Sequence, residues 1–295
     1  MDVLDSLIGV YIESPAKINL HLAVLGVRED GYHEIDSIFQ LVSLTDEIRI
    51  RSLKENDVLY IEGMNIPKHD NIIYRAVEVF RRETGIRSGL SVQITKRIPM
   101  GGGLGGGSGN AASVLIGLDR MFGTCLTKSD LSRLGAGLGS DVPFFCHAAC
   151  ARVRGRGEVV ESIPARTDYQ VILLYPGFGI SSQEAFMLLD RERGTYRSAE
   201  FDAVSMYRES LPEQWKFFNS FFPILAQADE RFKVLRERLQ LSGAVFSGLS
   251  GSGSTLFGIF QDEERASRAW KQLNGEGFCV WNVKPLDSGI NAIVE

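Results

Sequence analysis

The sequence predicts an α+β protein of two domains, and three observations support this prediction. Helix-like and strand-like segments alternate, but without the regular repeat of a doubly wound parallel sheet. The 295 residues are enough for two ordinary domains, and the composition, 44% hydrophobic and 23% charged, is typical of a globular protein. A second set of elements begins after residues 160–170, so we expect one domain at residues 1–165 and another at residues 166–295.

The first half of the chain begins with a strand pattern. Ile18, Leu20 and Leu22 recur at every second position, as in a half-buried strand that turns Lys17 to its opposite face. Further on, apolar residues at helical spacing end at Gly85, a plausible helix stop. The predicted strands are residues 18–24, 47–51, 58–62 and 90–94, with an extended stretch at 150–160, and the predicted helices are residues 72–83, 111–122 and 130–134.

The second half begins with a short apolar strand at residues 171–175, bounded by Pro176-Gly177. Ser181, with Glu184 three residues later, resembles a capping box, so a helix should begin there. The remaining predicted strands are residues 244–249, 255–260 and 278–283, with a Gly/Ser connection at 250–254, and the remaining predicted helices are residues 213–239 and 266–273.

Charge and composition exclude several classes of partner. The formal net charge is −5, without the basic excess of a nucleic-acid-binding protein. No apolar run approaches the length that spans a bilayer, and the N-terminal residues lack the pattern of a signal or transit peptide. We therefore expect a cytoplasmic protein that binds neither nucleic acid nor membrane.

The four cysteines are scattered, as expected of reduced thiols in a cytoplasmic protein. Cys146, His147 and Cys150 lie close together, but their spacing is not that of a paired zinc motif, and no second cluster completes it. We therefore expect small buried thiols there and no metal site.

The most informative stretch is a glycine-rich loop between a predicted strand and a predicted helix. Residues 101–109 contain seven glycines in nine positions. Glycine lets backbone N–H groups approach a phosphate closely, and the start of a helix adds free N–H groups and a favourable dipole. The loop therefore predicts a phosphate-binding site.

Other uses of this loop fit less well. It lacks the Gly-Lys-Ser/Thr ending of a P-loop, and no second βαβ strand with an acidic residue follows it, as a dinucleotide site requires. The remaining alternative is a flexible loop that binds nothing. Each glycine costs roughly 0.5–1 kcal/mol relative to alanine inside an element, so seven of them at a helix start favour phosphate binding.

Six blocks of sequence, in order and with matching spacing, resemble motifs of the GHMP kinases. The glycine loop resembles the second motif of that family, in a longer form that includes Asn110, and residues 138–144 resemble its catalytic aspartate segment. The other blocks are residues 14–20, similar to the first motif, residues 30–33 with 39–40, similar to the substrate-side signature, residues 70–71 at a helix start, and residues 250–255, similar to the third motif.

Three places depart from the usual pattern of that family. Gly109 stands where a second serine is common, although Ser108 keeps a hydroxyl in the loop. Arg154 and Arg156 lie in a segment that is usually less basic, and residues 219–221 replace a more acidic stretch. None of these departures removes a residue to which the resemblance gives a catalytic role.

The resemblance implies a two-domain GHMP kinase fold with a ribosomal-S5-like N-terminal domain and a ferredoxin-like C-terminal domain. It implies transfer of the ATP γ-phosphate to the 2-hydroxyl of a small molecule, a cytidine diphosphate methylerythritol, on the non-mevalonate route to isoprenoid precursors. Mg²⁺ would be carried by the nucleotide, and we expect a monomer or weak homodimer. Two alternatives stay open: a GHMP kinase of the homoserine or mevalonate type, and a non-catalytic nucleotide-binding sensor.

Two charged residues receive catalytic roles from the resemblance. Asp141 would accept or orient the proton of the acceptor hydroxyl, although an aspartate before Val-Pro also suits a helix N-cap. Lys17 would keep Asp141 ionised and neutralise charge on the transferring group, unless it is an ordinary solvated strand lysine. Asn19 lies on the same strand face as Lys17 and could hydrogen-bond the substrate.

The resemblance also assigns residues to the two ligands. Tyr32 and His33 would grip the cytosine ring, and Phe186 would form the opposite wall, unless it is a core residue of an amphipathic helix. Asn71 would contact adenine, or would only cap the following helix. The other expected ATP-binding residues are Pro99, Gly101, Gly102, Gly103, Leu104, Gly105, Gly106, Gly107, Ser108 and Gly109.

Overall fold

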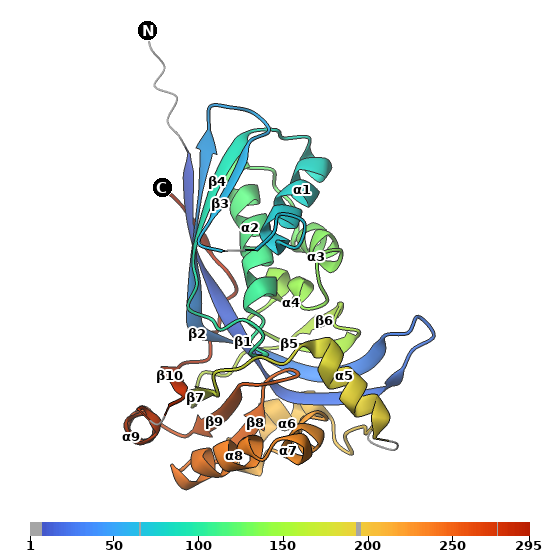
Figure 1. Cartoon of the computed structure of the whole chain (residues 1–295), viewed down its shortest axis with the longest axis vertical. Helices are drawn as coiled ribbons and strands as arrows, with labels where there is room; N and C mark the ends of the chain where they lie inside the picture. The colour runs from blue at the N-terminus through green and yellow to red at the C-terminus, as the bar shows by residue number, and fades with distance from the viewer. Residues whose placement is uncertain (1–7, 65, 193–195, 276) are drawn as a thin grey trace.

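The computed structural model describes residues 8–64, 66–192, 196–275 and 277–295, which form two β-sheets with helices packed against them (Figure 1). Within this part of the chain, the first sheet has seven strands in the order β11-β1-β2-β4-β3, and β5 and β6 continue it from β2. The strands are β1 (Gly9–Val27), β2 (His33–Leu53), β3 (Leu59–Glu62), β4 (Gly89–Thr95), β5 (Cys150–Gly155), β6 (Val159–Ser162) and β11 (Ala292–Val294).

Helices cover one face of the first sheet, and Figure 1 shows them side by side there. The second of them, α2, begins at Gly106, inside the glycine loop and five positions before the predicted start at 111. The predicted stop of the first helix is confirmed, because Gly85 has a φ of 74° and its N–H donates to the carbonyl of Arg81. These helices are α1 (Ile72–Thr84), α2 (Gly106–Phe122), α3 (Lys128–Ala136) and α4 (Val142–His147).

The second sheet is antiparallel and has the strand order β10-β7-β9-β8. Numbered along the chain, this order is 4-1-3-2, with helices after the first and third strands, so the predicted ferredoxin-like domain is confirmed. Its elements are β7 (Gln170–Tyr175), α5 (Ser182–Arg191), α6 (Ala203–Glu209), a 3₁₀ turn (Pro212–Gln214), α7 (Phe222–Ala228), α8 (Arg231–Leu241), β8 (Phe246–Leu249), β9 (Leu256–Phe260), α9 (Glu263–Leu273) and β10 (Cys279–Val283).

The continuous helix predicted at residues 213–239 is wrong. The chain between the 3₁₀ turn and α7 is not helical, because its backbone pairs with β1 instead of with itself. The N–H of Leu22 donates to the carbonyl of Phe218 over 2.9 Å, and the N–H of Ser220 donates to the carbonyl of Leu22 over 2.9 Å. Pro223 then lies in the first turn of α7, where its missing N–H costs nothing.

A bulge in β1 also changes one expectation about its faces. The pairing of β1 with β2 shifts register between Asn19 and His21. One extra residue reverses the alternation of side chains beyond the shift. Leu22 therefore lies on the same side as Lys17, whereas Ile18 and Leu20 point to the other side, as predicted.

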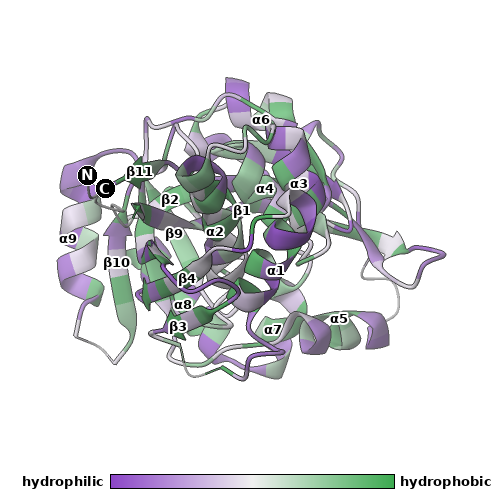
Figure 2. Cartoon of the chain, turned by 90° about the horizontal axis from the view of Figure 1, so that it is seen from above, coloured by the Kyte–Doolittle hydropathy of each residue, from purple (hydrophilic) through white to green (hydrophobic). Residues whose placement is uncertain are grey.

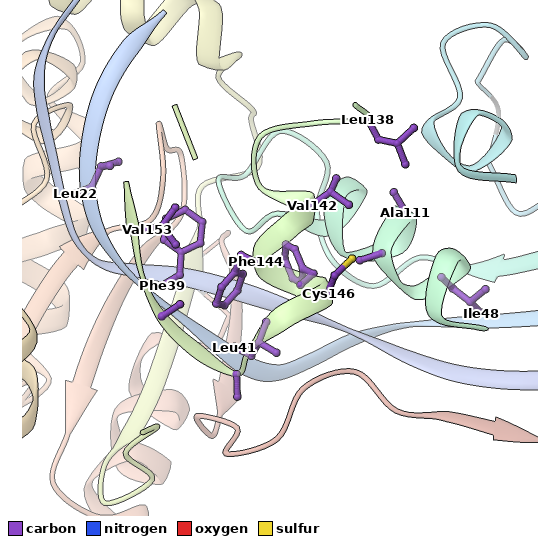
Figure 3. Close-up of a cluster of buried hydrophobic side chains, with 14 of the residues drawn as sticks. Leu22, Phe39, Leu41, Ile48, Ala111, Leu138, Val142, Phe144, Cys146 and Val153 are labelled. Atoms are coloured by element: carbon purple, nitrogen blue, oxygen red, sulfur yellow. The ribbon is translucent and has the colours of Figure 1, made fainter. Parts of the chain in front are cut away.

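The hydrophobic core has two layers that share the first sheet. One layer lies between this sheet and its helices, where the Phe39 and Phe144 rings meet edge to face with centroids 5.1 Å apart (Figure 3). The other layer packs Ile18 and Leu20 of β1 with Val171 of β7. Figure 2 shows the same arrangement from above, with apolar strands in the centre and polar residues on the outer helices.

The two sheets are therefore not independent units along the chain. We expected a separate core in each half, but one core layer joins the sheets, and the last strand, β11, pairs with β1 in the first sheet. The predicted division into domains at residues 1–165 and 166–295 therefore stays a prediction. What the structure adds is that residues 284–294 return from the second sheet to the first.

Two cysteines near the core are buried, as expected from the sequence. Burial raises the pKa of Cys146 and of Cys150 to about 12, so both remain protonated thiols at neutral pH. Among the described residues, no helix combines the length and the apolar character that a bilayer span requires.

His21 is a fully buried histidine on β1, held among aromatic rings of the 201–218 region. Its ring lies 4.7 Å from the ring of Phe218, edge to face, and its Nδ1 accepts a hydrogen bond from the Phe218 N–H over 3.3 Å. Burial lowers the pKa of His21 to about 4, although the carboxylate of Asp36 opposes the shift. The neutral imidazole is therefore the form that the folded protein accommodates.

The dependence of stability on pH should reflect the protonation of His21. Because the folded pKa lies below that of an unfolded histidine, unfolded chains bind the additional proton, and stability is lost as the pH falls from about 6.5 towards 4. Between pH 7.5 and pH 5 we expect a loss of about 2 kcal/mol from this group. Urea unfolding over this range would measure it. His21→Asn keeps an acceptor near Nδ1 and should remove this part of the slope, and an equal slope in both proteins would contradict the assignment.

Candidate active site

An open cleft of about 550 Å³ lies where the glycine loop meets the second sheet. Lys17 and Asn19 of β1 form its floor, and Asp141 lies at the start of α4. The other lining residues are Leu22, Ile35, Phe39, Met64, Ile66, Asp70, Ile72, Lys96, Pro99, Met100, Gly101, Gly102, Gly103, Leu104, Gly105, Gly106, Gly107, Ser108, Ser140, Arg156, Ile180, Ser181, Ser182, Phe186, Phe221, Gly251 and Ser252.

The glycine loop presents the beginning of α2 to this cleft. Gly105 is the N-cap with a φ of 69°, a left-handed conformation that glycine adopts without strain, and it has no side chain to cap the helix. The first helical hydrogen bond runs from Gly109 N–H to Gly105 O over 2.8 Å. The N–H groups of Gly106, Gly107 and Ser108 precede it, and they are therefore available to an anion.

Connections of the second sheet hold the loop from outside. The Ser250 hydroxyl donates to the Gly103 carbonyl over 2.9 Å, and the Thr255 N–H donates to the Gly102 carbonyl over 3.1 Å. A third bond runs from Ile180 N–H to the carbonyl of Gly101, also over 3.1 Å. The phosphate loop is thus positioned by residues that lie more than 70 positions later in the chain.

The charged pair predicted from the motifs is brought together at the floor of the cleft. Lys17 Nζ lies 3.4 Å from Asp141 Oδ2 and donates to Asn19 Oδ1 over 2.6 Å. The ammonium also lies 4.5 Å from the centroid of the Phe39 ring. Only 3% of Lys17 is exposed, so it is not a solvated strand lysine, and a buried ammonium of this kind requires a counter-ion such as Asp141.

The carboxylate of Asp141 does not cap α4. Although Asp141 occupies the N-cap position, its φ and ψ of −82° and −14° are helical, and its side chain makes no capping hydrogen bond. The carboxylate points instead towards Lys17 and is 31% exposed at the cleft. One oxygen therefore neutralises the lysine while the group remains accessible to a ligand.

Of the three residues expected to hold a base, Phe186 lines the cleft, whereas Tyr32 and His33 are not among the residues that line it. The His33 ring stacks directly on Phe186, with centroids 4.2 Å apart and planes at 19°. His33 Nε2 also lies 2.8 Å from Asp190 Oδ1. Partial burial opposes the change, but hydrogen bonds from Tyr196 and His33 keep the pKa of Asp190 below its usual value. Phe186 is thus half core and half cleft wall, because its other edge meets Phe221 at 4.9 Å.

Two residues expected to bind ATP lie outside the cleft lining. Asn71 is buried and caps α1, with its Oδ1 accepting from Ile73 N–H over 2.9 Å, whereas the neighbouring Asp70 lines the cleft. Gly109 faces β1: an added Cβ would lie 3.0 Å from the Pro15 carbonyl oxygen. That carbonyl leaves little room for the second serine that is common at this position in the family that the sequence resembles.

Several lining residues were not found from the sequence. Met64 and Ile66 come from a connection without periodicity, so no pattern marks them. Lys96 lies five positions before the glycine loop, so a search for cations beside the motifs could have found it, whereas Arg156 was noted from the sequence only as an unusual basic residue without a role. Lys96 forms an ion pair with the buried Asp46, whose carboxylate also accepts from the backbone N–H of Ile98 over 2.9 Å.

Two family models match the chain: the GHMP kinases N terminal domain over residues 71–149 and the GHMP kinases C terminal over residues 207–278. A 4-diphosphocytidyl-2-C-methyl-D-erythritol kinase of Treponema pallidum is 37% identical over 89% of this chain and 94% of its own length. The same kinase of Geobacillus kaustophilus is 34% identical, with 91% and 93% covered.

Solved structures agree with these relatives. A crystal structure of 4-(cytidine 5'-diphospho)-2C-methyl-D-erythritol kinase superposes with a TM-score of 0.82 at 29% identity, covering 93% of this chain and 98% of the other. A homoserine kinase from Cytophaga hutchinsonii superposes with a TM-score of 0.73 at 16% identity, covering 99% of both chains, a likeness of fold alone.

Proposed function

Because the chain belongs to the 4-diphosphocytidyl-2-C-methyl-D-erythritol kinases, within the GHMP kinases, we infer that its cleft transfers the γ-phosphate of ATP to the 2-hydroxyl of this cytidyl alcohol. The chain is an ATP-dependent kinase of isoprenoid precursor biosynthesis with the two-domain GHMP fold, including the predicted ribosomal-S5-like first domain. The observation that carries the site assignment is the Lys17–Asp141 pair beside an uncapped helix start.

At the reacting centre, Asp141 orients the acceptor hydroxyl and accepts its proton as the oxygen attacks the γ-phosphate. Its side chain is partly exposed at the cleft, and its Oδ2 lies near Lys17. Lys17 keeps this carboxylate ionised and places a positive charge near the transferring group. Asn19 holds the lysine in place, and its amide donates in turn to the Ser37 hydroxyl over 3.0 Å.

The phosphates of ATP bind at the start of α2, where backbone N–H groups and the helix dipole favour negative charge. The donor set suits a Mg²⁺ ion carried by the nucleotide, because the Ser108 hydroxyl and the Asp141 carboxylate line the same cleft. Such an ion would neutralise developing charge on the phosphates. The apolar residues Met64, Ile66 and Ile72 offer a wall for the adenine ring.

We assign the cytosine end of the substrate to Tyr32, His33 and Phe186. In the present arrangement His33 covers the face of Phe186, so a base can enter between these rings only if they separate. The start of β2 carries His33 and the helix α5 carries Phe186, and the stacking of these rings brings the β1–β2 hairpin and α5 together. We also propose a cytoplasmic monomer or weak homodimer.

A coupled ADP-release assay with ATP and Mg²⁺ tests the assignment. The cytidyl substrate should be preferred over homoserine and mevalonate by roughly 10³-fold or more in kcat/KM, because polar groups that bind the base would stay unpaired with the smaller alcohols. Turnover of homoserine or mevalonate at a comparable rate would move the chain to another GHMP activity. ATP binding without turnover of any alcohol would favour a sensor.

A further inference from the structure

The turn between β5 and β6 presents a single arginine to the cleft. Arg156 stands between two glycines with positive φ, Gly155 at 72° and Gly157 at 128°. The Glu158 carboxylate accepts from the Arg156 N–H over 2.7 Å, and an added Cβ on Gly157 would lie 3.0 Å from Ser140. The turn is therefore fixed in shape and packed against the residue that precedes Asp141.

The side chain of Arg156 has an aromatic partner and forms no ion pair among the described residues, although its charge is the smallest of several causes, led by the hydrogen bond from the Tyr32 N–H, that lower the pKa of Asp30. Its guanidinium carbon lies 4.8 Å from the centroid of the Tyr32 ring. Among the described residues, no carboxylate lies within ion-pair distance of this guanidinium. The nearby Asp30 is already engaged, because it lies 3.3 Å from Arg28 and accepts from the Tyr32 N–H over 3.1 Å. Arg156 thus keeps its planar fork of donors available.

The other cations of the cleft are already used. Lys17 pairs with Asp141, and Lys96 pairs with Asp46. Among the described residues, Arg156 is consequently the cation of the cleft lining that forms no ion pair. An arginine with a free fork is the side chain best suited to bidentate binding of phosphate oxygens.

The position of Arg156 matches the order of groups in the substrate. Its ring partner, Tyr32, is one of the residues to which we assign the base, and its turn packs on Ser140, beside Asp141, to which we assign the acceptor hydroxyl. In the cytidyl substrate the diphosphate joins these two groups. We propose that Arg156 binds the diphosphate of the substrate and thereby sets the preference for a nucleoside diphosphate over a nucleoside, an inference that rests on the proposed function.

Binding of CDP and of cytidine to the whole protein separates this role from simple packing. Calorimetry is done with a saturating non-hydrolysable ATP analogue, so that CDP cannot occupy the glycine loop. Arg156→Gln should lower the affinity for CDP by about 10- to 100-fold, as expected for lost charge-assisted hydrogen bonds. The affinity for cytidine should stay within about 2-fold of the wild-type value. Arg156→Lys keeps the charge without the fork and should recover part of the loss.

Arg154 provides a matched control on β5, two positions before Arg156. Its side chain is 47% exposed and lies 3.5 Å from Glu161, outside the cleft, so Arg154→Gln should leave both affinities unchanged. In turnover, Arg156→Gln should raise KM for the cytidyl substrate and leave both kcat and KM for ATP nearly constant.

Three results would overturn the proposal. If Arg156→Gln lowered the affinities for CDP and cytidine equally, Arg156 would only support Tyr32. If it lowered the affinity for ATP alone, Arg156 would face ATP. If the wild-type protein binds CDP no more tightly than cytidine, there is no diphosphate subsite. Failure to turn over the cytidyl substrate would instead remove the proposed function, and the CDP-to-cytidine ratio would still decide the role of Arg156.

Discussion

Asp141→Asn is expected to lower kcat by about 10²–10⁴-fold and to leave the affinity for ATP nearly unchanged. The amide has the size of the carboxylate but cannot accept the proton of the acceptor hydroxyl. It also leaves Lys17, which is only 3% exposed, without the charge that balances it. Single-turnover measurements of phosphoryl transfer, combined with equilibrium binding of ATP, would separate the chemical step from nucleotide binding.

Asp287→Asn is a suitable control for this substitution, because Asp287 is exposed and lies outside the cleft lining. It should leave kcat, KM and stability as they are. If Asp141→Asn retained the wild-type turnover number, Asp141 would have no part in the mechanism. If ATP binding were lost together with turnover, the carboxylate would act on the nucleotide or its metal rather than on the acceptor hydroxyl.

Gly103→Ala is expected to abolish ATP binding and to destabilise the fold by about 2–4 kcal/mol. An added Cβ would lie far inside van der Waals contact with the Ser250 carbonyl oxygen and 2.9 Å from the Gly253 carbonyl oxygen. The backbone φ of 77° adds strain for any residue with a Cβ. The loop and the 250–255 connection must therefore move apart, and the connection that holds the phosphate loop is lost. Urea unfolding and equilibrium binding of ATP would measure the two effects.

Two other glycines provide the comparison. At Gly289, away from the cleft, an added Cβ meets nothing within 4 Å, and Gly289→Ala should change neither stability nor ATP affinity. Gly107 lines the cleft, and an added Cβ there also meets nothing within 4 Å. Gly107→Ala should therefore leave the fold intact and lower only the affinity for ATP, because the new methyl group fills part of the phosphate site. Wild-type stability and affinity in Gly103→Ala would show that the contact with Ser250 does not hold the loop.

Much of the site could be predicted because its signals are local. The glycine loop requires conformations and close backbone approaches that only glycine permits, so its function is visible in consecutive residues, as at Gly105 with its φ of 69°. The capping box of Ser181 and Glu184 is also local, and α5 begins where it predicts. Lys17 and Asp141 were linked only by the family resemblance, since 124 positions separate them.

The misses have a common physical origin in contacts between distant parts of the chain. Residues 215–221 contain enough apolar residues for a helix, but their backbone pairs with β1, and the Ser220 hydroxyl accepts from the Val24 N–H, 196 positions away. The bulge after Asn19 moved Leu22 into the cleft by changing a register that composition does not encode. The contact of His33 with Phe186 likewise depends on where α5 lies against the β1–β2 hairpin.

The sequence by itself determined the α+β class, the phosphate loop and the identity of the charged residues, because helix starts, strand alternation and glycine-only conformations depend on neighbours in the chain. Only the tertiary structure decided which residues meet. It joined the two sheets through a shared core, returned β11 to the first sheet, and brought Arg156 onto the ring of Tyr32. These contacts depend on packing between distant segments, and local patterns do not specify such packing.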